Sequence, residues 1–242
     1  MVLPNDCCTG HCFPENHLQS SEWRVLTASE LATLSSKAVC REYGPGAELF
    51  HEGDECGGVY FIGDGLIGLR KEDADGNSVL LRLAGPGETL AYRPFLTGSS
   101  HSASAEVLEA CRICFVARRD LMPMLQQNPD FGLEILRRTA KNHDATETRL
   151  HQALTLNARA KFAHLLLIFK DRYGTMEADG ALRIDLPISR SDLASMIGLR
   201  SESLSRTIHQ MTDDGLVRFS GHRAWISDLT KLADEVAKKV EI

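Results

Sequence analysis

Residues 189–226 have the sequence SRSDLASMIGLRSESLSRTIHQMTDDGLVRFSGHRAWI, and this stretch decides the fold of the C-terminal part. It predicts a short helix over residues 190–197 that stops at Gly198, and a second helix over residues 201–212. A β-hairpin over residues 216–226 follows, with Ser-Gly-His at its turn. Helix, glycine-containing turn, helix and hairpin together indicate a winged helix-turn-helix, a unit that typically binds DNA.

The second of these helices has one apolar face and one polar face. Leu204, Ile208 and Met211 share the apolar face, and we expect them to pack inside. Arginine can bond both acceptors of guanine, glutamate can accept from cytosine, and serine can bond several bases. The residues predicted to contact DNA are Arg190, Arg200, Ser201, Glu202, Ser205, Arg206, His209 and Arg223. A solvated polar face on a small helical bundle is the alternative interpretation.

The region before this unit is rich in glycine and in short apolar runs. Twelve glycines fall between Gly44 and Gly98. The expected strands are 48–51, 58–62, 66–70 and 78–83, with turns at 63–65 and 75–77, and residues 103–117 supply two more short strands. Strands at this spacing favour a small all-β barrel or roll. A helix over residues 27–37 precedes it, in which Thr27 and Glu30 are placed to form a capping box.

A long helix is expected from about Phe131 to Leu156. One stripe of this helix, at alternating spacings of three and four residues, has apolar ends and a polar middle. A helix of this length in a short chain favours pairing with a second copy, so we expect a homodimer; an ordinary surface helix is the alternative. The predicted dimer residues are Leu133, Leu136, Ala140, His143, Glu147, Leu150 and Leu154.

These patterns predict an α+β fold in four parts. The first is a cysteine-rich N-terminal segment, residues 1–20, and the second is a β-roll sensor domain, residues 21–128. A dimerisation helix, residues 129–156, connects them to a C-terminal winged helix-turn-helix DNA-binding domain, residues 157–242.

Charge and composition argue against several classes of function. Lys and Arg total 27 against 33 Asp and Glu, a net charge of −6, which does not suit a polybasic protein that coats nucleic acid. The acidic excess is confined to residues 1–156, with 14 basic and 21 acidic side chains, whereas residues 157–242 hold 13 and 12. The chain has no catalytic constellation or phosphate-loop lysine, so we expect no enzyme. The sequence shows neither an apolar run of roughly 18 residues nor a secretory pattern, so we expect a cytoplasmic protein outside the membrane.

The chain has seven cysteines, all in its first half, at positions 7, 8, 12, 40, 56, 111 and 114. Their odd number and the expected reducing compartment argue against a disulfide framework. Cys40 and Cys111 are interpreted as small buried apolar residues. Three thiols within the first twelve residues do not suit that interpretation, because no core can form there.

The order of β-roll, long helix and winged helix-turn-helix resembles the CRP/FNR family of bacterial transcription regulators, over about residues 20–240. Gly63–Gly65 and Gly85–Glu88 look like turns of that family's cyclic-nucleotide-binding-like β-roll, and Asp185–Ala194 looks like its entry into the DNA-binding unit. Glu-x-x-Ser-Arg at residues 202–206 is similar to the FNR branch. This resemblance implies a double-stranded DNA target with TTGAT-like half-sites in a palindrome, and RNA polymerase as a partner.

The resemblance also implies roles for single residues. Glu202 and Arg206 would contact a shared G·C position and its neighbour, and Ser205 would contact a thymine at the outer end. In the CRP branch an Arg-Ser pair holds the phosphate of cyclic AMP, and His-Ser at residues 101–102 stands at that place here. Without the arginine the phosphate loses a bidentate partner, so we expect no cyclic AMP binding, although Glu88 could hold a ribose hydroxyl.

FNR-type regulators can carry an oxygen-labile [4Fe–4S] cluster, held by three N-terminal cysteines and one in the β-roll. Cys114 falls where the β-roll ligand of that branch falls. The resemblance therefore implies four ligands: Cys7, Cys8, Cys12 and Cys114. The spacing departs from the family pattern because two of the cysteines are adjacent, and Cys111 or His11 could substitute for one ligand.

Other chemistries for the sensor stay open at this point. The terminal cysteines could form a thiol redox switch, with Cys114 an inert strand residue. A haem could bind through His11, His17, His51 or a cysteine. The signal could be oxygen, nitric oxide or thiol oxidation, and a dimeric adaptor with inert cysteines is the remaining alternative.

Overall fold

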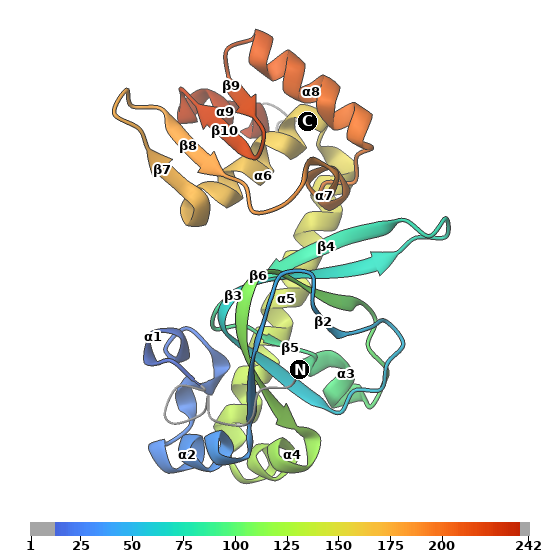
Figure 1. Cartoon of the computed structure of the whole chain (residues 1–242), viewed down its shortest axis with the longest axis vertical. Helices are drawn as coiled ribbons and strands as arrows, with labels where there is room; N and C mark the ends of the chain where they lie inside the picture. Colours follow the sequence, from blue (N-terminus) through green and yellow to red (C-terminus); the bar gives the residue numbers. More distant parts are fainter. Residues whose placement is uncertain (1–12, 238–242) are drawn as a thin grey trace. The chain divides into compact units, whose positions relative to one another are not determined.

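The structure is a computed structural model that describes residues 13–237, and it divides into two compact units, residues 1–144 and 145–242 (Figure 1). Helix α5 (Pro129–Thr155) crosses the division between them. Among residues 13–237, no helix combines the length and the apolar character that crossing a bilayer requires.

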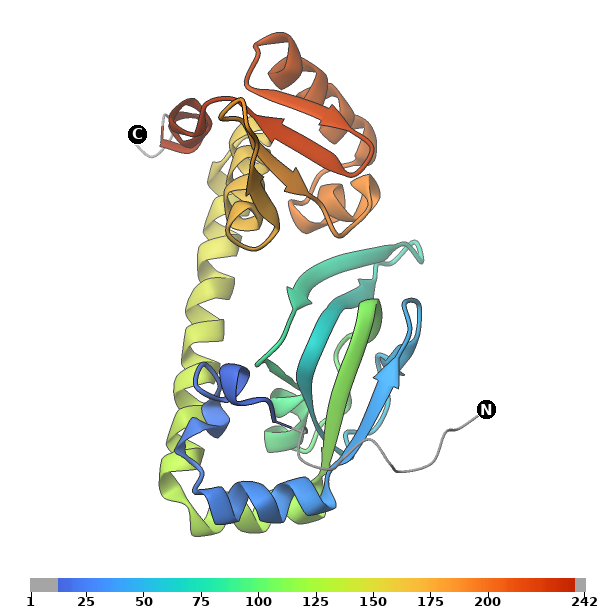
Figure 2. The ribbon, with the colours of Figure 1, turned by 60° about the vertical axis from the view of Figure 1, so that its left-hand side comes forward.

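The first unit is built on an antiparallel six-stranded sheet (Figure 2). Strands β1, β6, β3 and β4 lie side by side in that order, while β2 pairs with β6 and β5 pairs with β3. The strands are β1 (Val39–Tyr43), β2 (Glu48–Phe50), β3 (Gly58–Glu72), β4 (Ser78–Ala84), β5 (Thr89–Leu90) and β6 (Ser104–Ala117). The prediction of an α+β chain with an N-terminal β-roll is confirmed.

Two strands are longer than the sequence predicts. The expected turn at residues 63–65 is wrong, because β3 continues through it and its register with β6 shifts on either side of Asp64. Gly65 makes this bulge possible: its φ is +90°, and a Cβ there would lie 2.3 Å from the carbonyl oxygen of Ala110. Residues 103–117 likewise form the single strand β6 rather than two, since β3 pairs along most of its length.

Short helices flank the sheet and precede α5. They are α1 (Glu15–Leu18), the 3₁₀ helix η1 (Glu22–Val25), α2 (Ala28–Lys37), α3 (Tyr92–Thr97) and α4 (Arg118–Gln127). The capping box predicted for α2 is confirmed. The Thr27 hydroxyl accepts from the N–H of Glu30 at 3.3 Å, and the Glu30 carboxylate accepts from the N–H of Thr27 at 2.7 Å.

An aromatic cluster joins the N-terminal segment, residues 13–26, to the sheet and to α5. Trp23 is fully buried, and its ring lies 5.0 Å from Phe13, 6.0 Å from Phe61 of β3 and 5.2 Å from Phe131 of α5. The indole N–H of Trp23 donates to the hydroxyl of Thr89 at 2.8 Å, which satisfies the polar edge of the ring. The same core cluster contains Cys114.

Two cysteines of this unit form a disulfide that the sequence argument did not predict. Cys40 of β1 stands opposite Cys114 of β6 in the antiparallel register, with Cα atoms 4.0 Å apart, and their sulfurs are bonded. The interpretation of Cys40 as an inert buried residue is therefore wrong. The physical reason is strand pairing, which brings together two side chains 74 residues apart in sequence.

The second unit contains a four-stranded antiparallel sheet in the order β7–β8–β10–β9. Its strands are β7 (Gly174–Met176), β8 (Leu182–Asp185), β9 (Val217–Ser220) and β10 (Arg223–Ile226). Its helices are α6 (Ala158–Tyr173), α7 (Arg190–Met196), α8 (Ser201–Asp213) and α9 (Leu229–Ala237). The predicted winged helix-turn-helix is confirmed, and β7 is an addition to it.

Candidate nucleic-acid interface

Local hydrogen bonds fix the turn between α7 and α8. The hydroxyl of Ser189 accepts from the N–H of Asp192 at 3.1 Å and so caps the start of α7. Gly198 adopts a φ of +66° after α7, a conformation that costs glycine least. The N–H of Leu199 then donates back to the carbonyl of Ala194 at 2.9 Å. These bonds set where α8 begins.

Helix α8 has the two faces that the sequence predicts. Leu204, Ile208 and Met211 are buried, as expected. Thr207 is buried as well, which the sequence argument missed; its hydroxyl donates to the carbonyl of Ser203 at 2.9 Å, so the polar group is satisfied inside the helix. The predicted contact residues Arg200, Ser201, Glu202, Arg206 and His209 are exposed, and Ser205 is half-buried.

Two arginines, one on the hairpin of β9 and β10 and one at the start of α7, stack on aromatic rings of the hairpin. The guanidinium of Arg218 lies 4.1 Å from the centroid of the Trp225 ring, and that of Arg190 lies 4.9 Å from the Phe219 ring. The start of α7 therefore packs against β9. Stacking restricts each guanidinium while leaving its N–H groups able to donate to phosphate oxygens.

Arg223 is held by an acidic neighbour. Its guanidinium donates to the Asp185 carboxylate at 3.0 Å, and Arg183 donates to the other oxygen of the same carboxylate at 3.0 Å. The hydrogen bond to Asp185 raises the pKa of Arg183. Because Asp185 partly neutralises Arg223, a contact between Arg223 and DNA has to share that side chain with the carboxylate.

The stripe predicted for dimer contacts is exposed along α5. Leu133, Leu136, Leu150 and Leu154 are all large apolar residues exposed by 41–79%. Ala140, His143 and Glu147 on the same stripe are exposed too. Exposed leucines in this number on one helix indicate a surface that a partner covers.

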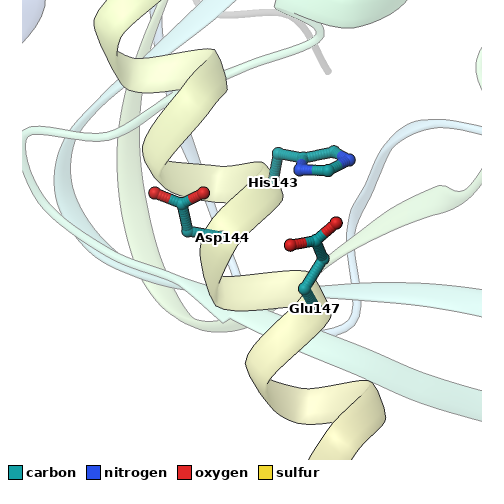
Figure 3. Close-up of side chains that lie close together, drawn as sticks. All are labelled: His143, Asp144 and Glu147. Carbon is teal, nitrogen blue, oxygen red and sulfur yellow. The ribbon is translucent and has the colours of Figure 1, made fainter.

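The polar middle of the stripe gathers metal-binding side chains. His143 and Glu147 project to the same side of α5, and one ligand atom from each of His143, Asp144 and Glu147 lies within 4.8 Å of the others (Figure 3). All three side chains are exposed. Acidic groups on exposed helices are common without an ion, so we assign no metal to them.

The cysteines and histidines predicted for the sensor fall into two groups. Cys7, Cys8, His11 and Cys12 lie outside the described residues. Cys114 is fully buried and bonded to Cys40, and Cys111 is buried with its thiol directed at the carbonyls of Glu109 and Leu66, at 3.0 and 3.5 Å. His17 is half-buried, and the exposed His51 lies 3.4 Å from the Glu48 carboxylate.

Glu88, which the family resemblance suggests as a contact for a ribose hydroxyl, is engaged within the first unit. Its carboxylate accepts from Arg82 at 3.0 Å, from Arg138 of α5 at 3.2 Å and from the N–H of Gly85 at 2.8 Å. A ribose hydroxyl would compete with these bonds. The absence of cyclic AMP binding stays a prediction.

A β-roll followed by a long helix and a winged helix-turn-helix defines the class: DNA-binding transcription regulators with a cyclic-nucleotide-binding-like domain. Residues 40–128 match the cyclic nucleotide-binding domain, and residues 160–235 match the Crp-like helix-turn-helix domain. The chain belongs to the CRP/FNR family of transcription regulators. The chain is a transcription regulator. Its relatives are likewise transcription regulators and not enzymes.

Relatives from both branches of the family are similar over most of their length. The transcriptional activator protein FnrL of Cereibacter sphaeroides is 27% identical over 86% of this chain and 84% of its own. The CRP-like cAMP-activated global transcriptional regulator of Mycobacterium tuberculosis is 24% identical over 85% and 91%. The structure of FixK2 from Bradyrhizobium japonicum has the same fold, with a TM-score of 0.69 at 23% identity over 81% of this chain and 96% of that one.

Proposed function

We propose that this regulator recognises a TTGAT–N4–ATCAA-like palindrome as a homodimer and responds to oxygen or redox state through its cysteines. RNA polymerase is the partner through which it would change transcription. The observation that carries the DNA part is one face of α8, where the exposed Glu202 and Arg206 and the half-buried Ser205 lie at helical spacing. Side chains three and four residues apart lie on one face and reach neighbouring base pairs together.

Fluorescence anisotropy on a labelled palindromic duplex tests the DNA proposal. Arg206→Ala should weaken specific binding by about 1–3 kcal/mol per half-site, or roughly 5- to 150-fold for each, and relax the preference for the contacted base. Arg119→Ala is the matched control, because Arg119 is 88% exposed on α4 of the other unit. Equal binding of the wild type to the palindrome and to a scrambled duplex would show that the proposed target is wrong.

Sedimentation velocity tests the dimer surface. Leu136→Glu and Leu150→Glu place charges on the exposed apolar ends of the stripe and should shift the protein towards monomer. Lys141→Glu is the control, because Lys141 is exposed on α5 but lies off the stripe. If all three variants keep the wild-type sedimentation coefficient, α5 is not the dimer surface.

For the sensor we propose a [4Fe–4S] cluster on Cys7, Cys8, Cys12 and Cys114, with Cys111 as the substitute ligand. Support comes from the core around Cys114: Phe13, the residue after Cys12, is buried in the same cluster and packs 5.0 Å from Phe61, which stands opposite Cys114 in register. The structure as it stands does not fit a cluster, because the Cys114 sulfur is bonded to Cys40. Cluster binding therefore requires that the disulfide is reduced and that Cys114 carries a free thiol. A bound cluster would make the protein sensitive to oxygen, because the cluster itself is oxygen-labile.

Analysis of iron and acid-labile sulfide in anaerobically reconstituted protein tests this cofactor. Cys114→Ser should abolish the bound iron and sulfide, whereas Cys56→Ser, which changes another buried thiol, should retain them. Haem binding through His17 or His51, or a sensor without a cofactor, becomes the better explanation if wild-type protein binds no iron after reduction and reconstitution.

A further inference from the structure

We propose that Cys40 and Cys114 form a reversible redox pair, in which oxidation by a peroxide withdraws Cys114 from metal binding. The proposal deepens the one above and, for its metal part, rests on Cys114 being a ligand. Its basis is strand pairing. Cys40 and Cys114 stand opposite each other between β1 and β6, flanked by the register pairs Val39 with Phe115 and Arg41 with Ile113.

Because the flanking pairs hold the register, the two sulfurs stay neighbours after the bond between them is reduced. Side chains directly opposite on antiparallel strands leave the same face of the sheet. The pair can therefore close and open without rearrangement of the sheet. No other cysteine among residues 13–237 has this placement: Cys111 stands opposite Tyr43, and Cys56 lies outside the strands.

The two cysteine residues differ in access to solvent. Cys114 is fully buried in the core that includes Trp23 and Phe131. Cys40 is half-buried and belongs to β1, an edge strand of the sheet. A reagent can thus reach Cys40 first, and Cys114 is placed to act only on its neighbour.

This asymmetry gives a balanced reaction. The Cys40 thiolate attacks one oxygen of the peroxide, the O–O bond breaks, and Cys40 becomes a sulfenic acid while hydroxide leaves and takes a proton to form water. The Cys114 thiolate then attacks the Cys40 sulfur, the S–S bond forms, and a second water leaves. Both thiols are oxidised and one hydrogen peroxide is reduced to two waters. Two equivalents of a small thiol restore both protein thiols: the first attacks the Cys40 sulfur and releases Cys114, and the second releases Cys40 and forms a small-molecule disulfide.

Disulfides of proteins that work in a reducing compartment are usually transient and serve catalysis or redox sensing. A transcription regulator meets its DNA in such a compartment. The Cys114 sulfur can bond to Cys40 or to iron, and one bond excludes the other. Oxidation of Cys40 by peroxide would therefore prevent Cys114 from binding iron, although Cys40 is not itself a proposed ligand.

Counting thiols in the full-length protein tests the pair. Reduced wild type, treated with hydrogen peroxide and then alkylated under denaturing conditions, should yield a peptide in which Cys40 is linked to Cys114, and dithiothreitol should release it. Cys40→Ser should leave Cys114 alkylatable, and Cys56→Ser should behave as the wild type. If peptide mapping finds Cys114 alkylated after oxidation, or linked to another cysteine, the pair does not form and the proposal is overturned.

Iron uptake tests the consequence. After peroxide treatment the wild type should lose its capacity to bind iron and sulfide, while Cys40→Ser should keep it. Equal loss in both proteins would overturn the competition between disulfide and metal. If no variant binds iron even when fully reduced, the proposed cluster fails and the metal part of this inference fails with it, whereas the thiol count still decides whether the redox pair exists.

Discussion

Replacing Trp23 tests whether the N-terminal segment is docked in the core as the structure has it. The Trp23 indole donates to the buried hydroxyl of Thr89 and packs against Phe13, Phe61 and Phe131. Trp23→Phe keeps an aromatic ring there but removes the N–H donor. Thr89→Val keeps the shape at position 89 but removes the acceptor.

The expected cost has two parts. Leaving the Thr89 hydroxyl buried without its donor costs about 1–3 kcal/mol, and the smaller ring of phenylalanine loses apolar burial of about 1 kcal/mol. Trp23→Phe should therefore lower the free energy of unfolding by about 2–4 kcal/mol. Thr89→Val should cost about 1–3 kcal/mol, since it leaves the indole N–H unpaired. The double variant lacks both partners of the hydrogen bond. Its loss of unfolding free energy should therefore be smaller than the sum of the two single losses by about 1–2 kcal/mol.

Urea unfolding followed by circular dichroism of the four proteins measures this coupling. The chain has one other tryptophan, Trp225, which is half-buried in the second unit and provides a matched control. Trp225→Phe combined with Thr89→Val should be additive within about 0.5 kcal/mol. An equally additive result for Trp23→Phe with Thr89→Val would refute the hydrogen bond, and with it the docking of the N-terminal segment at Thr89.

Three further variants test local features by urea unfolding. Gly65→Ala should destabilise the chain by about 2–3 kcal/mol, because Gly65 has a φ of +90° and no room for a Cβ; a neutral result would contradict the bulge in β3. Thr27→Ala should cost about 1 kcal/mol. The Thr27 N–H and the Thr27 hydroxyl both donate to the Glu30 carboxylate and lower its pKa, and Thr27→Ala removes only the hydroxyl. The part of the cost that comes from the hydroxyl should therefore be present while Glu30 is ionised and should shrink as the pH falls through the lowered pKa. Arg138→Met should cost about 3 kcal/mol by leaving the buried Glu22 carboxylate without its cation, and adding Glu22→Gln should recover part of the loss.

The winged unit could be predicted from sequence because its signals are local. Ser189 caps α7, Gly198 supplies the positive φ of the turn, and the apolar residues of α8 recur at helical spacing. Each signal spans only a few residues, so no long-range contact was needed to interpret it. Thr207 lies three residues after Leu204 and four before Met211, on the same face, but it was missed because its side chain is polar; the hydrogen bond to the Ser203 carbonyl is what allows the hydroxyl to be buried.

The side-chain contacts of the first unit could not be predicted from the sequence in the same detail, because they join residues that lie far apart in sequence. The pairing of Cys40 with Cys114 depends on the register between β1 and β6, and a shift of one residue would turn either side chain to the other face. The placement of Trp23 against Phe131 depends on how the N-terminal segment lies on the core, across more than one hundred residues. Turn residues were misleading at Gly65, where a bulge and a hairpin turn have the same local sequence signal.

Two connections lead from the cysteines to α5, and they use different parts of the first unit. The N-terminal one is short: Phe13 follows Cys12 in sequence, packs on Trp23, and Trp23 packs on Phe131 in the first turn of α5. The other begins at Cys114 in β6, the strand that leads directly into α4 and then α5. Because both end at the start of the helix that carries the exposed leucine stripe, a change at either set of cysteines can alter the same dimer surface. Under the two proposals made above, loss of a cluster and oxidation of the Cys40–Cys114 pair would both act on this proposed dimer surface, so the two signals would shift the same equilibrium of the dimer.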